Sequence, residues 1–156
     1  MKKGILIHAS SMTCPDMLYA SGFKCIDPFT YLETGGFKAV IVSQMEYGRA
    51  AREAAAGVSV VEAGSLTESR DPRRIVRAAL SRHRADLWEV PCGFPYYMAE
   101  YLVSKGFQLK CRRNPFLPAR EIKTPVQLAD ITESLRLAEK GMRKAVDEIA
   151  AAKVDA

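Results

Sequence analysis

The stretch EIKTPVQLADITESLRLAEKGMRKAVDEIAAA, residues 121–152, is the most informative part of the 156-residue chain. Thr124, Pro125 and Gln127 have the order of a capping box: Thr as N-cap, Pro at the first helical position and Gln at the third. Apolar side chains then recur at spacings of three and four, at Leu128, Ile131, Leu135, Ala138, Met142, Ala145 and Ile149. This pattern predicts one helix over residues 125–153 with a single apolar stripe.

The predicted helix is long for a chain of this size. At 1.5 Å per residue it would extend roughly 43 Å, which exceeds the width of a compact domain. Its far end should therefore overhang, and its apolar stripe should be covered by another domain or by a second copy of the chain.

The preceding residues predict an α/β domain. Short runs rich in β-branched residues predict strands at residues 4–8, 37–43, 58–62, 85–90 and 107–111. Helices are predicted between them, at residues 45–56, 72–83 and 95–105, and residues 112–120 look like a linker. This alternation predicts a three-layer α/β/α domain with a mixed central sheet of five or six strands, followed by the long C-terminal helix.

Composition indicates a soluble globular protein, with 48% apolar and 26% charged residues. The sequence has no apolar run of the ~18 residues that a membrane span needs. The apolar run of residues 5–7 is too short for a signal peptide. We therefore expect a cytoplasmic protein without a membrane partner.

The cysteines and the charge give narrower expectations. Cys14, Cys25, Cys92 and Cys111 form no C-x-x-C pair and have no nearby His at a zinc-like spacing, so buried free thiols are expected. Of the net charge of +5, the segment of residues 70–84 contributes six Arg against one Asp. A broad nucleic-acid surface is therefore not expected. This segment is interpreted as the solvated face of a helix, and an acidic partner is the alternative.

Four motifs together resemble a known family. DMLYASGF at residues 16–23, MEYGRA at 45–50, REIKTP at 120–125 and AEKGM at 138–142 follow one another in that order. They resemble the N-terminal domain of pita-bread metallopeptidases, the aminopeptidase P and proline dipeptidase (Xaa-Pro dipeptidase) enzymes with creatinase as a relative. The resemblance implies a ribonuclease-H-like arrangement in this domain and a linker helix that begins a second, catalytic domain.

In that family the catalytic domain binds two divalent metals, Mn, Co or Zn, through two Asp, one His and two Glu, and hydrolyses an Xaa-Pro bond. The resemblance divides the chain into a creatinase-like domain, residues 1–119, and the linker with the first helix of an absent catalytic domain, residues 120–156. No His follows Thr124. We therefore expect no catalytic, cofactor-binding or metal-binding residue in this chain, and no activity from it alone. The expected partners are a second copy, as a homodimer, and the catalytic domain, with peptide substrate only in the full-length enzyme.

Several residues allow a second interpretation. Asp16 and Glu46 could form a carboxylate pair, but each is better explained by a favourable place at the start of a turn or helix. His8 and His83 have no carboxylate at ligand spacing. Cys92 could be a reactive thiol, although no His follows to activate it. The Tyr96 to Leu102 segment and Trp88 are instead predicted to pack in the core.

A nuclease and a free-standing module remain to be weighed. Ribonuclease-H-like nucleases place an Asp in the first strand, and GILIHAS at residues 4–10 has no carboxylate, which argues against a nuclease. A free-standing module that dimerises through the final helix stays open as the alternative function. The lack of a helix-stopping Gly or Pro after Lys153 favours the first part of a longer protein.

Overall fold

The structure is a computed structural model that describes residues 1–152. The chain forms two compact units, Met1–Leu117 and Pro118–Ala156. The strands of the first unit are β1 (Lys3–Ala9), β2 (Phe29–Thr34), β3 (Phe37–Val42), β4 (Ser59–Glu62), β5 (Leu87–Pro91) and β6 (Leu109–Arg112). Its helices are α1 (Pro15–Ser21), α2 (Gln44–Glu53), the 3-10 helix η1 (Ala63–Ser65), α3 (Pro72–Arg82) and α4 (Tyr96–Ser104). The second unit contains the 3-10 helix η2 (Pro118–Glu121) and α5 (Pro125–Ala151).

The six strands form one sheet in the order β4-β3-β2-β1-β5-β6. Strand β2 is antiparallel to both of its neighbours, while the pairs β1–β5, β3–β4 and β5–β6 are parallel. Since β1 and β3 are both antiparallel to β2, all strands except β2 run in the same direction. Their carboxyl ends therefore meet at one edge of the sheet.

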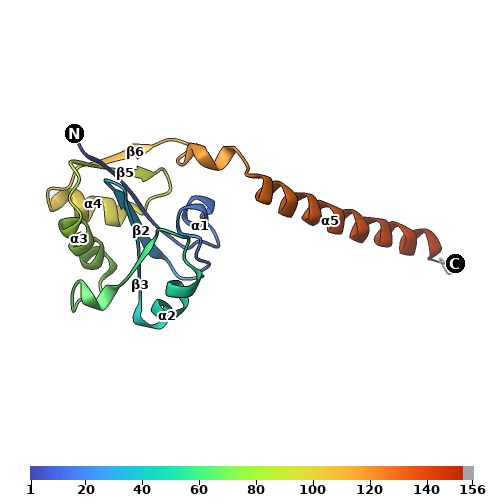
Figure 1. The fold of residues 1–156 in the computed structure, drawn as a ribbon, viewed down its shortest axis with the longest axis horizontal. Helices are drawn as coiled ribbons and strands as arrows, with labels where there is room; N and C mark the ends of the chain where they lie inside the picture. Colours follow the sequence, from blue (N-terminus) through green and yellow to red (C-terminus); the bar gives the residue numbers. More distant parts are fainter. Residues whose placement is uncertain (153–156) are drawn as a thin grey trace. The chain divides into compact units, whose positions relative to one another are not determined.

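Each face of the sheet is covered by a pair of helices (Figure 1). Consecutive residues of a strand point to opposite faces, so Leu6 and Ile7 of β1 enter different cores. On one face the core includes Val76 and Leu80 of α3 and Met98 and Leu102 of α4; on the other it includes Met17 of α1 and Ala50 of α2. The predicted three-layer α/β/α class with a mixed sheet is confirmed.

The predicted strands and helices of this unit are all found, with ends shifted by at most three residues. The helix predicted over 45–56 ends earlier, at Glu53, and Gly57 lies in the turn before β4 with φ +82°. Besides the 3-residue 3-10 helix η1, two elements of this unit were not predicted. Helix α1 has only 7 residues, and β2 is buried along most of its length, so it lacks the alternation by which a half-exposed strand is recognised.

Helix α5 begins as predicted. The Thr124 hydroxyl accepts a hydrogen bond from the Gln127 amide (3.2 Å), and the Gln127 side-chain oxygen accepts one from the Thr124 amide (3.0 Å). No residue of α5 is buried; Leu135 and Met142 of the stripe are 61% and 67% exposed. Among the described residues of its own unit, 118–152, the one other helix is the one-turn η2, so this part of the unit offers no second apolar surface. The predicted end at Lys153 lies outside the described residues.

Candidate functional site

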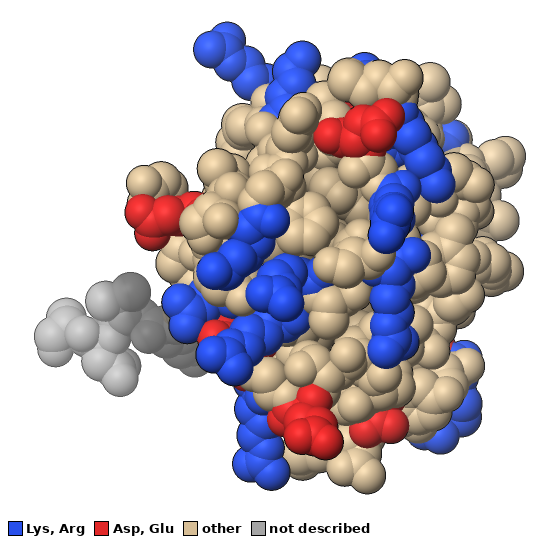
Figure 2. All heavy atoms as spheres, turned by 90° about the vertical axis from the view of Figure 1, so that its left-hand side faces the viewer, with Lys and Arg blue, Asp and Glu red and all other residues tan. Residues whose placement is uncertain are grey.

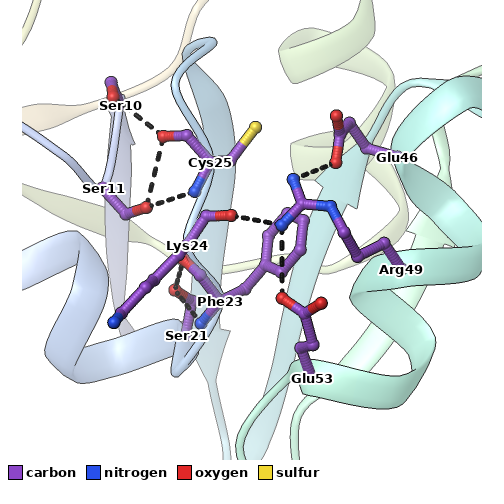
Figure 3. Close-up of polar contacts among 9 residues, drawn as sticks. All are labelled: Ser10, Ser11, Ser21, Phe23, Lys24, Cys25, Glu46, Arg49 and Glu53. Atoms are coloured by element: carbon purple, nitrogen blue, oxygen red, sulfur yellow. Dashed lines mark hydrogen bonds and ion pairs between the residues drawn. The ribbon is translucent and has the colours of Figure 1, made fainter.

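The loop of residues 22–28, between α1 and β2, is held by hydrogen bonds from both sides (Figure 3). On one side the Ser11 hydroxyl accepts a hydrogen bond from the Cys25 amide (2.7 Å), and the Ser10 hydroxyl donates one to the Cys25 carbonyl (2.9 Å). On the other side Arg49 of α2 donates to the Lys24 carbonyl (2.6 Å). The loop backbone is therefore fixed by side chains from two separate segments.

Arg49 also joins two of the four sequence motifs. Its guanidinium lies 4.5 Å from the centre of the Phe23 ring and forms ion pairs with Glu46 and Glu53 on the same helix. Phe23 is fully buried, and the Arg49 guanidinium packs over its ring in a cation–π contact. The DMLYASGF and MEYGRA motifs thus form one structural unit, in which Glu46 pairs with Arg49.

A cavity of about 310 Å³ opens beside this loop, at the carboxyl edge of the sheet. It is lined by the end of β1, the start of β2, the end of β3 and the first turns of α2, α3 and α4. The lining residues are His8, Cys25, Asp27, Pro28, Phe29, Thr30, Ile41, Val42, Ser43, Glu46, Ala63, Pro72, Ile75 and Tyr97. This edge is where α/β proteins commonly bind ligands. The walls are mainly apolar, with the two carboxylates Asp27 and Glu46.

His8 and Cys25 of the cavity are not arranged as a nucleophile and its base. His8 is 8% exposed, and its Nδ1 lies 2.9 Å from the Thr30 hydroxyl oxygen. Burial lowers the pKa of His8 to about 4, so the ring is neutral at pH 7. Burial also raises the pKa of Cys25. Both shifts disfavour a thiolate–imidazolium pair, which a cysteine nucleophile would need.

The basic segment of residues 70–84 contains the whole of α3. Arg73 pairs with Asp71 (2.8 Å) and lies 5.4 Å from the centre of the Tyr101 ring of α4. A shallow groove of about 510 Å³ lies here, lined by Leu66, Thr67, Asp71, Arg73, Arg74, Arg77, Ala78, Tyr101 and Lys105. Figure 2 shows basic side chains gathered on this side of the molecule. The interpretation of these side chains as a solvated helix face, with an acidic partner as the alternative, stays a prediction.

The other sequence candidates are placed as follows. Asp16 lies in the first turn of α1, as expected, and has an interaction partner. His83 caps the end of α3 and stacks on Phe37, with ring centres 4.3 Å apart. Trp88 is 1% exposed, so its predicted core position is confirmed.

Two expectations about burial are wrong. Cys92 and Cys111 are exposed, so only part of the cysteine set is buried. Tyr96 and Tyr97 are also exposed, at 78% and 51%, because the first turn of α4 points its tyrosines outward while Met98 and Leu102 fill the core. The anchoring role of Arg49 had no signal beyond its membership of the MEYGRA motif, and those of Ser10 and Ser11 had none, since all three depend on how distant segments pack.

Within residues 1–152 no group of three or more His, Cys, Asp or Glu side chains lies close enough together to hold a metal ion. In the same part of the chain, no helix combines the length and hydropathy needed to cross a membrane. The residues described here therefore do not fit a two-metal centre.

Comparison with known proteins gives a clear structural likeness. The chain is similar to an Xaa-Pro dipeptidase from Bacillus anthracis (TM-score 0.78, 13% identity), with 94% of this chain and 39% of that chain covered. It is similar to the prolidase from Pyrococcus furiosus (TM-score 0.69, 19% identity), with 93% and 39% covered. It also resembles the creatinase/prolidase N-terminal domain of an X-Pro dipeptidase from Streptococcus pyogenes (TM-score 0.51, 14% identity), with 70% and 82% covered.

These likenesses confirm that the chain has the fold expected from the resemblance, that of the N-terminal domain of Xaa-Pro peptidases. At such identities they establish the fold alone. The chain spans 39% of the length of the Bacillus dipeptidase and the Pyrococcus prolidase. No protein-family model and no curated protein sequence matches the chain.

Proposed function

We propose that this chain is the non-catalytic N-terminal domain of an Xaa-Pro-cleaving metallopeptidase of the aminopeptidase P or proline dipeptidase type. The observation that carries the proposal is the extent of the structural likeness. Unit Met1–Leu117 is 117 of 156 residues, so a match that covers 94% of the chain also includes residues of the second unit. The likeness therefore extends past the sheet domain into the segment that contains η2 and α5.

Hydrolysis is assigned to a catalytic domain outside this chain. Because the described residues do not fit a two-metal centre, the two divalent ions, Mn, Co or Zn, belong in that domain, where they would activate water and polarise the scissile carbonyl. The full-length protein would be a cytoplasmic hydrolase. The boundary between the two domains is placed at residues 119 and 120.

The exposed stripe of α5 supports a role in domain and subunit contacts. Its large apolar side chains, from Leu128 to Ile149, are 42% to 76% exposed. A stripe of this length is typical of a helix that packs against a partner. We assign the stripe to the catalytic domain, and we assign homodimer contacts and the restriction of access to the active site to this domain as a whole.

A hydrolysis assay tests the catalytic part of the proposal. The purified chain is incubated with Mn²⁺ and with an Xaa-Pro dipeptide or a tripeptide whose second residue is proline, and bound metal is quantified in parallel. We expect no turnover and no stoichiometric metal, with the Pyrococcus furiosus prolidase as positive control. Turnover with tightly bound metal would mean that His8, His83, Asp16 or Glu46 form a site, and the proposal would be wrong.

The alternative is a free-standing module that dimerises through α5 and has no peptidase partner. The exposed stripe on α5 is the observation that favours it. Sedimentation equilibrium of the chain and of an Ile131→Glu/Leu135→Glu variant tests it, with Arg136→Glu on the polar face as control. A tight dimer that only the stripe variant dissociates would favour the module. A monomer with a helical α5 would favour a stripe reserved for a catalytic domain.

A further inference from the structure

Two exposed cysteines lie side by side at the β5–β6 edge of the sheet. Cys92 follows the last residue of β5, and Cys111 lies in β6. Their sulfur atoms are 3.2 Å apart, with the Cys111 thiol donating toward Cys92 and the Cys92 thiol donating to the Arg112 carbonyl (3.5 Å). Both residues belong to unit Met1–Leu117.

The backbone already brings these side chains together. Strands β5 and β6 are paired through Val90 with Cys111 and Pro91 with Arg112, and Cys92 comes next along the chain. A disulfide needs the two sulfurs at about 2.05 Å, so they must approach by roughly 1 Å. Because both thiols are exposed, a reagent reaches them without unfolding; Cys25, at 4% exposed, does not offer that access.

We propose that Cys92 and Cys111 form a thiol-modification site that low-molecular-weight disulfides oxidise to an intramolecular disulfide. The Cys92 thiolate attacks one sulfur of the reagent, forms a mixed disulfide and releases one thiolate. The Cys111 thiolate then attacks the Cys92 sulfur and releases the second thiolate. The two protein thiols lose two electrons and two protons, and the reagent disulfide is reduced to two thiols.

The hydrogen bond between the two thiols sets the order of attack. It raises the pKa of Cys111, the donor, so that Cys111 is the less available thiolate of the pair. Cys92 is therefore the first nucleophile, and Cys111 is the resolving thiol.

The cross-link would tie the turn before α4 to an edge strand. β6 has one neighbour in the sheet, and its end is already held by an ion pair between Arg112 and Glu89 of β5 (2.7 Å). An edge strand with few bonds frays more readily than a central strand. Oxidation thus protects β6, a consequence that goes beyond the proposed peptidase role.

The test uses the full chain and oxidised glutathione. We expect an intact mass lower by two hydrogen atoms, a peptide map that links Cys92 to Cys111, and a fall from four titratable thiols to two in denaturant. Cys111→Ser should accumulate glutathione on Cys92, and Cys92→Ser should react about tenfold more slowly. Cys14→Ser is the control and should still form the link.

Three results would overturn the proposal. These are a stable mixed disulfide in the wild-type chain, a disulfide-linked dimer, and four thiols that remain free at a reagent excess that modifies an unstructured cysteine peptide. A second measurement tests the consequence separately: amide hydrogen exchange in Leu109–Arg112 should slow on oxidation and recover on reduction. Unchanged exchange would contradict the protection of β6.

Discussion

Helices α3 and α5 begin with the same kind of cap, but α3 is partly buried and α5 is exposed along its whole length. Each has a capping side chain followed by proline at the first helical position: Asp71 and Pro72 in α3, Thr124 and Pro125 in α5. Yet α3 buries Val76, Ala79 and Leu80 against the sheet, whereas α5 buries no residue. Start signals are local, while burial depends on a second surface supplied by the rest of the protein.

The difference changes what stabilises each helix. Helix α3 is held by a core, so its stability is part of the cooperative unfolding of Met1–Leu117. Helix α5 rests on its 27-residue length, its cap and exposed ion pairs such as Lys144–Glu148, which contribute a few tenths of a kcal/mol each. Four predictions test this contrast.

The largest expected effect is the loss of a core leucine. Leu80→Ala should destabilise the domain by about 2–5 kcal/mol, because Leu80 is 1% exposed, whereas Leu135→Ala in α5 should cost less than ~0.5 kcal/mol. Urea unfolding followed by the fluorescence of Trp88, the one tryptophan, reports on the domain. A cost for Leu135→Ala that grows with protein concentration would break the contrast and show that a second copy covers the stripe.

Burial should also make the domain sensitive to acid. The pKa of His8 is about 4 in the folded chain, against 6.5 for an exposed histidine, so between these values the unfolded state binds the extra proton. The contribution of His8 is therefore present above pH 6.5 and is lost as pH falls toward 4, by about 3 kcal/mol. Urea unfolding at both pH values should show this loss; His8→Gln should remove it, and His83→Gln should keep most of it. If the free energy of unfolding falls equally with pH in the wild type and in His8→Gln, the acid sensitivity does not come from His8.

Glycines in the two units should respond in opposite directions. A Cβ on Gly4 would lie 2.6 Å from the ring of Trp88, which is buried and cannot move aside, so Gly4→Ala should cost about 1–3 kcal/mol in urea unfolding. Gly93→Ala, which has no atom within 4 Å of the new Cβ, is the control and should be near neutral. Gly141→Ala in α5 should instead raise helix content in circular dichroism, by up to ~1 kcal/mol of helix stability. A destabilising Gly141→Ala would indicate close packing at that point of α5.

Sequence reasoning succeeded where the signals are local. The capping residues of α3 and α5 and the spacing of three and four in α5 correctly predicted where both helices begin. The same reasoning missed β2, because Phe29–Thr34 is buried on both faces and carries no alternation. It also misjudged Cys92, Cys111 and the tyrosines at the start of α4, because their exposure depends on the β5–β6 pairing and on which turn of α4 faces the core.

The candidate site divides in the same way. The motifs that contain Phe23 and Arg49 were recognised in the sequence, but their contact with each other was not predicted. The Arg49 guanidinium lies over a ring 26 residues away along the chain, and such a tertiary contact leaves no local signal. The cavity beside them was not predicted either. It is formed by segments between His8 and Tyr97 that only the sheet order brings together.

The smallest expected effect compares the two caps directly. Asp71 accepts a hydrogen bond from the Arg73 amide (2.9 Å), and Thr124 accepts one from the Gln127 amide (3.2 Å), so alanine at either position removes about 1 kcal/mol of helix stabilisation. For Asp71→Ala the loss should appear in the urea midpoint of the Trp88 signal, because α3 unfolds with the core. For Thr124→Ala it should appear only as lower helix content, with the Trp88 midpoint unchanged. If Thr124→Ala shifts that midpoint as much as Asp71→Ala does, α5 is energetically part of the sheet domain, and the distinction between a packed helix and one that awaits its partner is lost.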